Sequence, residues 1–265
     1  MDRRRAYLLS AGALALAALL SACGEGGGRS EGPAKANGEA ADAGYQAPLR
    51  TVSVSASPEG GAIVRGTAPP EARVRASMPD KSAYGATTDG DGAFVIELPR
   101  SAEPRLVALS AEEADRSVQA EGWLFVPPDR PDAAVLLRAG APAVPFPGAG
   151  LLATVDYDGA GGAAVAGRTT ANTPVRVSVD GRPAGRGRSD AAGVYGVRLN
   201  GPIKAGEHAL RVETDKVAAE RRVVLASRAP GGVFSAARTE AGWRVDWTPP
   251  GGGAQSTLVL VEPKA

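Results

Sequence analysis

Apolar and polar residues alternate along most of the chain from residue 50 onward. One stretch sets Val74 and Ala76 between polar residues, and another sets Phe94, Ile96 and Leu98 two residues apart. Because successive side chains of a β-strand point to opposite faces, this period of two predicts half-buried strands. We expect strands at 51–56, 62–66, 72–77, 93–98, 106–110, 118–126 and 133–138, then at 175–179, 195–199, 210–212, 223–225 and 233–237.

The second half of the chain repeats the first at a shift of 101 positions without a gap. The shift places Gly66 on Gly167, Val74 on Val175, Asp89 on Asp190 and Gly92 on Gly193. The shared letters are turn residues and inward-facing apolar residues, whereas most of the others differ. This pattern predicts a duplicated fold and not a duplicated catalytic site.

A second repeated motif lies at the end of each copy. Gly122-Trp123 and Gly242-Trp243 are both followed by two prolines and an apolar strand, which predicts the same terminal tryptophan strand in each copy. Turn residues punctuate the chain and no long helical period occurs, so the fold class is all-β, with antiparallel sandwiches. Residues 110–113 also fit a helix capping box, which leaves a helical turn there as an alternative.

The residues around the repeated turn resemble those of a known family of domains. Gly66, Val74, Thr88, Asp89, Asp91, Gly92, Phe94 and Leu98 carry a likeness to bacterial Ig-like repeat domains and to the related carboxypeptidase regulatory-like domains. The second copy departs from the pattern at Ser189, Ala191 and Ala192. The resemblance implies two tandem Ig-like β-sandwich domains, at residues 49–140 and 151–265, joined by a linker at 141–150. Each copy has its own inward row, so we expect fragments 49–140 and 149–265 to fold alone. The alternative is that residues 123–137 pair with the second copy, which would make one continuous or exchanged sandwich.

The amino terminus is typical of an exported protein. Three arginines, an apolar run and small residues precede Cys23, the plan of a secretory signal over residues 1–22. Leu20-Ser21-Ala22-Cys23 resembles the bacterial lipoprotein lipobox, which implies cleavage before Cys23 and lipidation of its thiol. An uncleaved membrane helix is the alternative. Residues 23–48 bury too little apolar surface to fold and predict a flexible tether. Gly24 in place of aspartate implies the outer membrane, with the chain facing the periplasm or the cell surface.

The composition of the chain limits the kinds of partner, metal site and active site that it could have. Thirty basic and 29 acidic residues give a net charge of +1, which disfavours nucleic acid as a partner. A single cysteine and a single histidine, His208, argue against a disulfide framework, a histidine metal centre and nucleophilic catalysis, and we expect no cofactor. Asp89 and Asp91 could begin a calcium loop, but the second copy lacks the second carboxylate, so a side-chain-capped turn explains both copies better.

Two surface features are candidates for binding. Trp243, Val245 and Trp247 share one face of a predicted strand; we expect Trp243 in the core and Trp247 exposed, where it would stack on a sugar. Arginines 182, 186, 188, 221 and 222 form either a basic patch or, as we favour, a solvated strand face. The sequence thus predicts a non-enzymatic envelope lipoprotein that acts as a structural or protein-interaction module. The alternative is a glycan- or peptidoglycan-binding lipoprotein.

Overall fold

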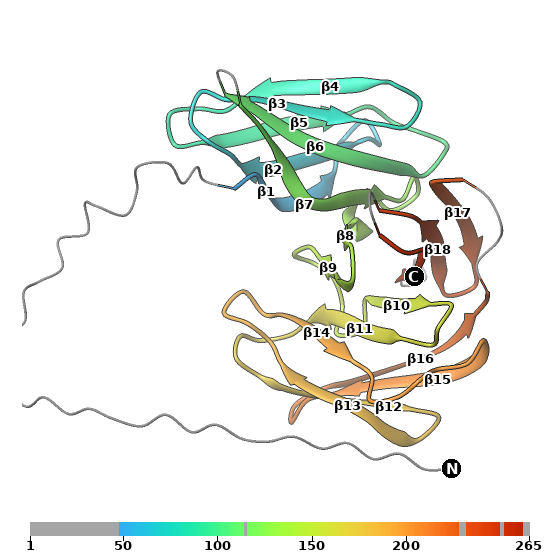
Figure 1. Ribbon diagram of the computed structural model, residues 1–265. Helices are drawn as coiled ribbons and strands as arrows, with labels where there is room; N and C mark the ends of the chain where they lie inside the picture. The colour runs from blue at the N-terminus through green and yellow to red at the C-terminus, as the bar shows by residue number, and fades with distance from the viewer. Residues whose placement is uncertain (1–47, 114–115, 228–231, 250–251, 262–265) are drawn as a thin grey trace, which may run out of the picture. The chain divides into compact units, whose positions relative to one another are not determined.

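The computed structural model describes residues 48–113, 116–227, 232–249 and 252–261 (Figure 1). The predicted signal peptide, Cys23 and residues 24–47 of the predicted tether lie outside the described residues. The described residues all belong to one compact unit, residues 46–265.

Two antiparallel sheets form the first sandwich. One has the order β1-β2-β5, with β1 at Arg50–Ala56, β2 at Ala62–Thr67 and β5 at Ala93–Leu98. The other has the order β4-β3-β6-β7-β8-β9, with β3 at Arg73–Ser77, β4 at Ala83–Thr87, β6 at Arg105–Glu113, β7 at Arg116–Val126, β8 at Val135–Arg138 and β9 at Ala141–Pro145. A short 3₁₀ helix, η1 (Pro131–Ala133), lies between β7 and β8. The core between the sheets includes Ile96, Leu98 and Leu109.

The second sandwich repeats this plan and extends it. One sheet has the order β14-β11-β10-β19-β18-β17, with β10 at Thr154–Asp158, β11 at Ala163–Arg168, β14 at Val194–Arg198, β17 at Phe234–Thr239, β18 at Gly242–Trp247 and β19 at Gln255–Leu260. The other has the order β13-β12-β15-β16, with β12 at Pro174–Val179, β13 at Arg182–Arg188, β15 at Gly206–Glu213 and β16 at Ala218–Leu225. Val165, Leu210 and Val212 are fully buried between them.

The predicted inward rows are confirmed in both copies. Phe94, Ile96 and Leu98 are at most 3 % exposed, and Tyr195 and Val197 are buried at the matching positions of the second copy. Each row belongs to a strand with one face on a core and the other toward solvent, so buried and more exposed residues alternate along it. The protein is therefore all-β, built of antiparallel β-sandwiches. Among the described residues, no helix has the length and apolar character needed to cross a bilayer.

The repeated aspartate makes the same turn twice. Oδ1 of Asp89 accepts hydrogen bonds from the amides of Asp91 (3.0 Å) and Ala93 (2.8 Å), and Asp190 accepts the equivalent pair at 2.9 and 2.8 Å. Gly92 follows with a φ of +78°, a conformation that glycine adopts without strain. Local backbone amides therefore use this carboxylate, and the prediction of a side-chain-capped turn is confirmed.

The departure of the second copy at Ser189 preserves the chemistry of Thr88. Oγ1 of Thr88 accepts a bond from the amide of Ala72 (2.8 Å) and donates one to the carbonyl of Pro69 (2.7 Å). Oγ of Ser189 makes the equivalent two bonds at 2.9 and 2.6 Å. A hydroxyl is what this buried loop requires, because it satisfies one backbone donor and one acceptor at once.

The structure decides one alternative and departs from the sequence pattern at one residue. Residues 110–113 continue strand β6 and do not form a helical turn, because Ser110 pairs with Gln119 of β7. The period of two over residues 51–56 would place Val52 on the same face as the buried Val54, but Val52 is 55 % exposed. The register of β1 shifts between Thr51 and Ser53, and the extra residue of this bulge reverses the direction of the side chain.

The predicted linker is an ordered part of the first sandwich. Strand β9 lies within residues 141–150 and pairs with β8. Phe146, just after it, is 3 % exposed and belongs to the first core. Independent folding of fragments 49–140 and 149–265 stays a prediction, and the first fragment as drawn would lack Phe146.

Candidate functional site

Two tryptophan hairpins meet between the sandwiches. Trp123 of β7 pairs with Leu137 of β8, and Trp243 of β18 pairs with Val259 of β19. The glycine before each tryptophan permits this pairing, because a Cβ atom there would lie 2.0 Å from the carbonyl oxygen of Leu137 or Val259. The Gly-Trp motif that is repeated in the sequence therefore lies in a hairpin that is repeated in the structure. The hairpins do not hold equivalent places, however, since β7 joins the sheet of β3 while β18 joins the sheet of β10.

The facing sides of these hairpins form a third apolar core, which we call the aromatic junction. Its members are Leu106, Trp123, Phe125, Val135, Leu137 and Ala143 from the first copy and Phe234, Ala236, Trp243, Val245, Trp247 and Val259 from the second. The ring centroids of Trp123 and Trp247 lie 6.1 Å apart, and Phe125 lies 6.4 Å from both Phe234 and Trp243. These are tilted pairs at favourable aromatic distances. The junction therefore packs like the interior of a domain.

Polar contacts orient the rim of the aromatic junction. The indole Nε1 of Trp243 donates a 2.9 Å hydrogen bond to Asp129, in the loop between β7 and β8. The guanidinium of Arg238 lies 2.8 Å from the same carboxylate and 5.6 Å from the centre of the Trp243 ring. Both charged side chains are about half exposed, so the ion pair adds little stability and mainly fixes geometry.

Strand β9 adds a second connection between the copies through Asp156. The amide of Ala143 donates to one carboxylate oxygen of Asp156 (2.8 Å), and the hydroxyl of Thr257 donates to the other (2.6 Å). Burial raises the pKa of Asp156 to about 6, although both hydrogen bonds act in the opposite direction. The Asp156 carboxylate thus holds β9 against β10 and β19 and plays a structural part.

The expectation for the tryptophans was wrong in detail. Trp247 is 2 % exposed, whereas Trp243 and Trp123 are partly exposed. The shared face of Trp243, Val245 and Trp247 is confirmed, since all three line the aromatic junction. The first sandwich covers this face, most deeply at Trp247, while Trp243 lies at the rim beside Asp129. Periodicity defines the face of a strand, but not which element covers it.

A cavity of about 290 Å³ opens beside the aromatic junction. Its walls include Leu109, Trp123, Leu137, Trp247 and Pro249. The cavity lies where β7 bulges away from β6, because the register shifts between Ala108 and Ser110. Gln119 and Glu121 also line it, so the cavity combines an apolar wall with two polar side chains.

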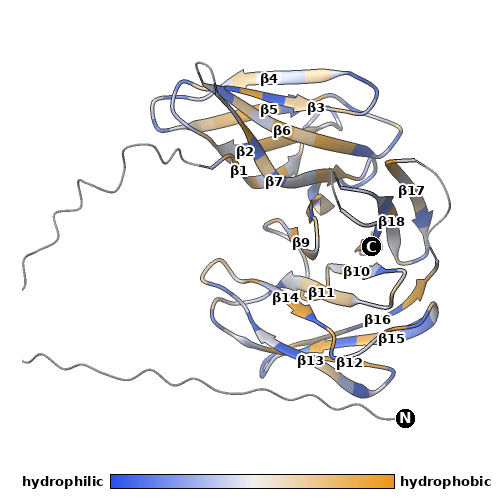
Figure 2. Cartoon of the chain, in the orientation of Figure 1, coloured by the Kyte–Doolittle hydropathy of each residue, from blue (hydrophilic) through white to orange (hydrophobic). Residues whose placement is uncertain are grey.

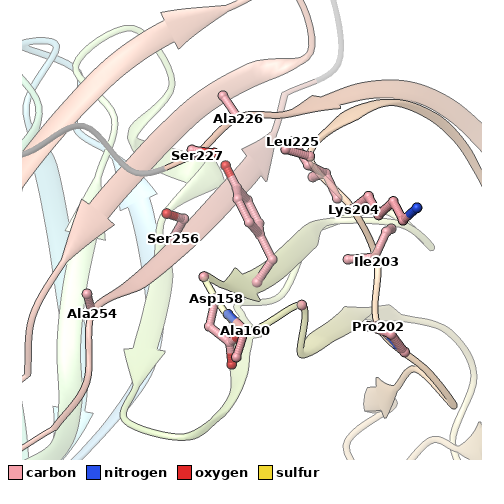
Figure 3. A pocket seen from close by; sticks show the side chains of 14 residues that line it. Asp158, Ala160, Pro202, Ile203, Lys204, Leu225, Ala226, Ser227, Ala254 and Ser256 are labelled. Atoms are coloured by element: carbon pink, nitrogen blue, oxygen red, sulfur yellow. The ribbon is translucent and has the colours of Figure 1, made fainter.

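A cavity of about 400 Å³ lies at one end of the second sandwich (Figure 3). Asp158 ends β10 and Ala160 lies in the turn after it, while Pro202 to Lys204 come from the loop after β14 and Ser256 from β19. The polar groups are largely committed to the fold: Asp158 caps its own turn through the amides of Ala160 and Gly162, and Ser256 donates to Asp246. Tyr157, Lys204 and Leu225 also line this cavity, so its walls combine apolar side chains and backbone with a tyrosine and a lysine.

His208 fixes the loop that borders this cavity. Its Nδ1 lies 2.8 Å from Oδ2 of Asp180, and its Nε2 lies 2.9 Å from the carbonyl oxygen of Lys204. Both partners only accept hydrogen bonds, so only the protonated ring satisfies both. Burial by itself lowers the pKa of His208, but the bonds to Asp180 and Lys204 outweigh it and the pKa is raised above 6.5. The histidine thus has a structural role.

This geometry predicts that stability falls at mildly alkaline pH. Because the folded-state pKa of His208 is raised, its contribution is complete below the unfolded value of 6.5 and is lost as pH rises through the folded value. We expect the urea midpoint to fall between pH 6 and pH 8.5, and to fall less in His208→Gln. Equal falls in the two proteins would show that another group is responsible.

The predicted basic residues do not form one patch. Arg182, Arg186 and Arg188 lie along β13, whereas Arg221 and Arg222 lie on β16. These strands are opposite edges of one sheet. The structure therefore supports the interpretation as solvated strand faces.

Comparisons with known proteins identify no family. No family model matches the chain, and no curated protein matches it. Among solved structures, the chain is similar to "Biofilm associated protein - BSP domain", at 13 % identity and a TM-score of 0.24 over 70 % of this chain and 30 % of that one. It is also similar to "Central Fibronectin-III array of RIM-binding protein", at 11 % identity and a TM-score of 0.26 over 77 % of this chain and 72 % of that one. This chain thus spans less than a third of the first protein's length, and neither likeness carries an argument about function.

Proposed function

We propose that this chain is a non-enzymatic lipoprotein of a bacterial envelope, in which two Ig-like sandwiches act as one stiff structural or interaction module. Acyl chains on Cys23 would hold it on the outer membrane, facing the periplasm or the cell surface. The tether of residues 24–48 would have an average reach of roughly 25–30 Å as a flexible coil. The folded unit would then stand clear of the lipid headgroups.

The observation that carries the proposal is the aromatic junction. Tandem modules that move independently expose polar surfaces to each other, whereas here Phe125, Trp247 and Val259 are at most 2 % exposed. Separating the sandwiches would bring this apolar surface into water, at about 25 cal/mol per Å². A stiff unit held at a defined distance from a membrane suits support or presentation of a binding surface.

Two further features support a non-enzymatic function. His208, the only histidine, uses both ring nitrogens to fix a loop. The carboxylates of Asp156 and Asp158 are committed to backbone and hydroxyl donors. These three side chains, which acid–base chemistry could otherwise use, therefore serve to hold the fold.

The anchor is tested by Cys23→Ser. Without the thiol there is no acceptor for diacylglycerol, so we expect a protein that takes up no labelled palmitate and keeps its signal peptide. Metabolic labelling followed by gel electrophoresis measures both results, with Gly24→Ser as a matched control that should still be labelled. Palmitate in the Cys23→Ser protein would contradict the anchor.

A second candidate function is glycan binding. The cavity beside the aromatic junction is lined by the partly exposed Trp123, and an indole face can stack on a sugar ring. The test is co-sedimentation of the soluble chain, starting at Gly24, with purified peptidoglycan sacculi. Binding that Trp123→Ala abolishes would favour this candidate, and a chain that stays in the supernatant would favour the protein-interaction module.

A further inference from the structure

The two repeated halves of the chain differ in the residues of the same edge strand. Strand β4 ends its sheet in the first copy, and β13 ends the matching sheet in the second. Gly85 and Thr87 of β4 correspond to Arg186 and Arg188 of β13 at the shift of 101 positions. Figure 2 shows the contrast, with β4 pale and β13 partly blue. No charged residue lies in β4, whereas β13 carries three arginines and a proline.

The edge of β4 exposes backbone groups that can pair with another strand. At the β3–β4 turn, the amide of Met78 donates a hydrogen bond to the carbonyl of Ser82 (3.0 Å). Because the backbone groups of successive residues in a strand point to opposite sides, this bond shows which residues of β4 bond to β3 and which do not. Ala83, Gly85 and Thr87 therefore direct their N–H and C=O groups away from β3. Gly85 and Thr87 are also exposed. Such an edge is a template for strand addition unless something blocks it.

The edge of β13 is blocked in three ways. Arg186 and Arg188 occupy positions whose backbone groups point outward, Pro183 has no amide to donate, and the amide of Asn200 bonds to the carbonyl of Ala184 (2.7 Å). In the first copy, the position that matches Asn200 is Pro99, which has no amide for the same bond. The first copy therefore lacks all three of these protections.

We propose that β4 pairs with β4 of a second copy of this chain, antiparallel and centred on Gly85. In this register, the outward residues match: Gly85 faces its counterpart, and Ala83 faces Thr87 of the partner subunit. Tyr84, which packs on the first core, comes beside Ala86 of the partner subunit and extends the apolar face. The two six-stranded sheets become one continuous sheet across the two-fold axis.

Charge complementarity selects this occupant. Lys81 and Asp89 flank β4 at equal distances from Gly85, and both are exposed. The antiparallel register therefore brings the turn that carries Lys81 to the same end of the pairing as Asp89 of the partner subunit, and the two-fold axis repeats this at the other end. The same arrangement on β13 would set Arg186 against its own counterpart, and like charges directly opposite each other destabilise a strand pair. The chain is thus self-complementary at β4 and self-repelling at β13.

Single cysteines test the register in the soluble chain that begins at Gly24, which has no other cysteine. Hydrogen-bonded antiparallel partners have Cα atoms about 5.5 Å apart, within disulfide range. Gly85→Cys should therefore give a disulfide-linked dimer on mild oxidation. Ala83→Cys, on the same face of the same strand, should not, because its counterpart lies four residues along. Equal cross-linking of both variants, or of neither, would overturn the proposal.

Sedimentation equilibrium provides an independent test. The parent chain should dimerise reversibly, and Gly85→Arg should raise the dissociation constant at least about tenfold by setting two like charges opposite each other. A Cβ on Gly85 meets only the carbonyl of Val74 at 3.2 Å, and Thr87→Arg places the same charge without replacing a glycine. Arg186→Gly is the matched control and should leave the dimer unchanged. A parent chain that stays monomeric at high micromolar concentration, or a dimer that both arginine variants leave intact, would contradict β4 pairing.

Discussion

Phe125→Ala should lower the free energy of unfolding by about 3–5 kcal/mol and should uncouple the two sandwiches. Phe125 is completely buried in the aromatic junction, and its ring contacts Phe234 and Trp243 of the other copy. Truncation of a buried phenylalanine removes its transfer free energy and leaves a cavity. Because this cavity would lie between the sandwiches, each would retain its own core while their mutual contact weakens.

The chain contains its own probe for this effect. All three tryptophans, Trp123, Trp243 and Trp247, belong to the aromatic junction, so tryptophan fluorescence reports on it and far-UV circular dichroism on the sheets. In Phe125→Ala, the fluorescence transition should come at lower urea than the dichroism transition. Leu210→Ala, in the second core, is the control and should shift both transitions of that protein together. Coincident transitions in Phe125→Ala would show that the ring does not couple the sandwiches.

Gly92→Val and Gly193→Val should each lower the free energy of unfolding by about 1–3 kcal/mol, because a β-branched residue is strained in a left-handed conformation. The two glycines have φ of +78° and +79°. A Cβ atom would also lie 2.3 Å from the carbonyl oxygen of Ala68 in the first copy and 2.2 Å from that of Thr169 in the second. Strain and collision thus act in the same direction.

Gly90 provides the matched control for this turn. A Cβ at Gly90 would meet nothing within 4 Å, and the second copy already carries Ala191 at the matching position. Gly90→Val should therefore leave the urea midpoint nearly unchanged. A loss as large as that of Gly92→Val would mean that the whole turn resists side chains, and not the left-handed position alone.

Local features of the fold could be predicted from the sequence because they depend on neighbouring residues. The inward rows follow from the period of two, and the turns at Asp89 and Asp190 follow from an aspartate that caps the amides two and four residues ahead. The duplication strengthened both predictions, because one copy served as a test of the other. It also marked Thr88 and Ser189 as equivalent positions, whose hydroxyls prove to make the same bonds.

The aromatic junction could not be predicted, because it depends on which surfaces meet. The pattern around Trp247 defined an apolar face but gave no sign that the first sandwich covers it. The sequence hinted at such a contact only through the alternative that residues 123–137 pair with the second copy; in the structure these strands pair within the first sheet and pack against the second copy by their side chains. The role of Asp156 was hidden in the same way, since its partner Ala143 lies in a segment rich in proline and glycine that is typical of a linker.

The central claim, that the aromatic junction makes one unit of two sandwiches, is tested most directly by urea unfolding of the soluble chain from Gly24. Tryptophan fluorescence and far-UV circular dichroism should give coincident transitions with the same midpoint, because the junction and both sandwiches unfold together. A fluorescence transition at clearly lower urea than the dichroism transition would show that the sandwiches separate first, and would contradict the claim.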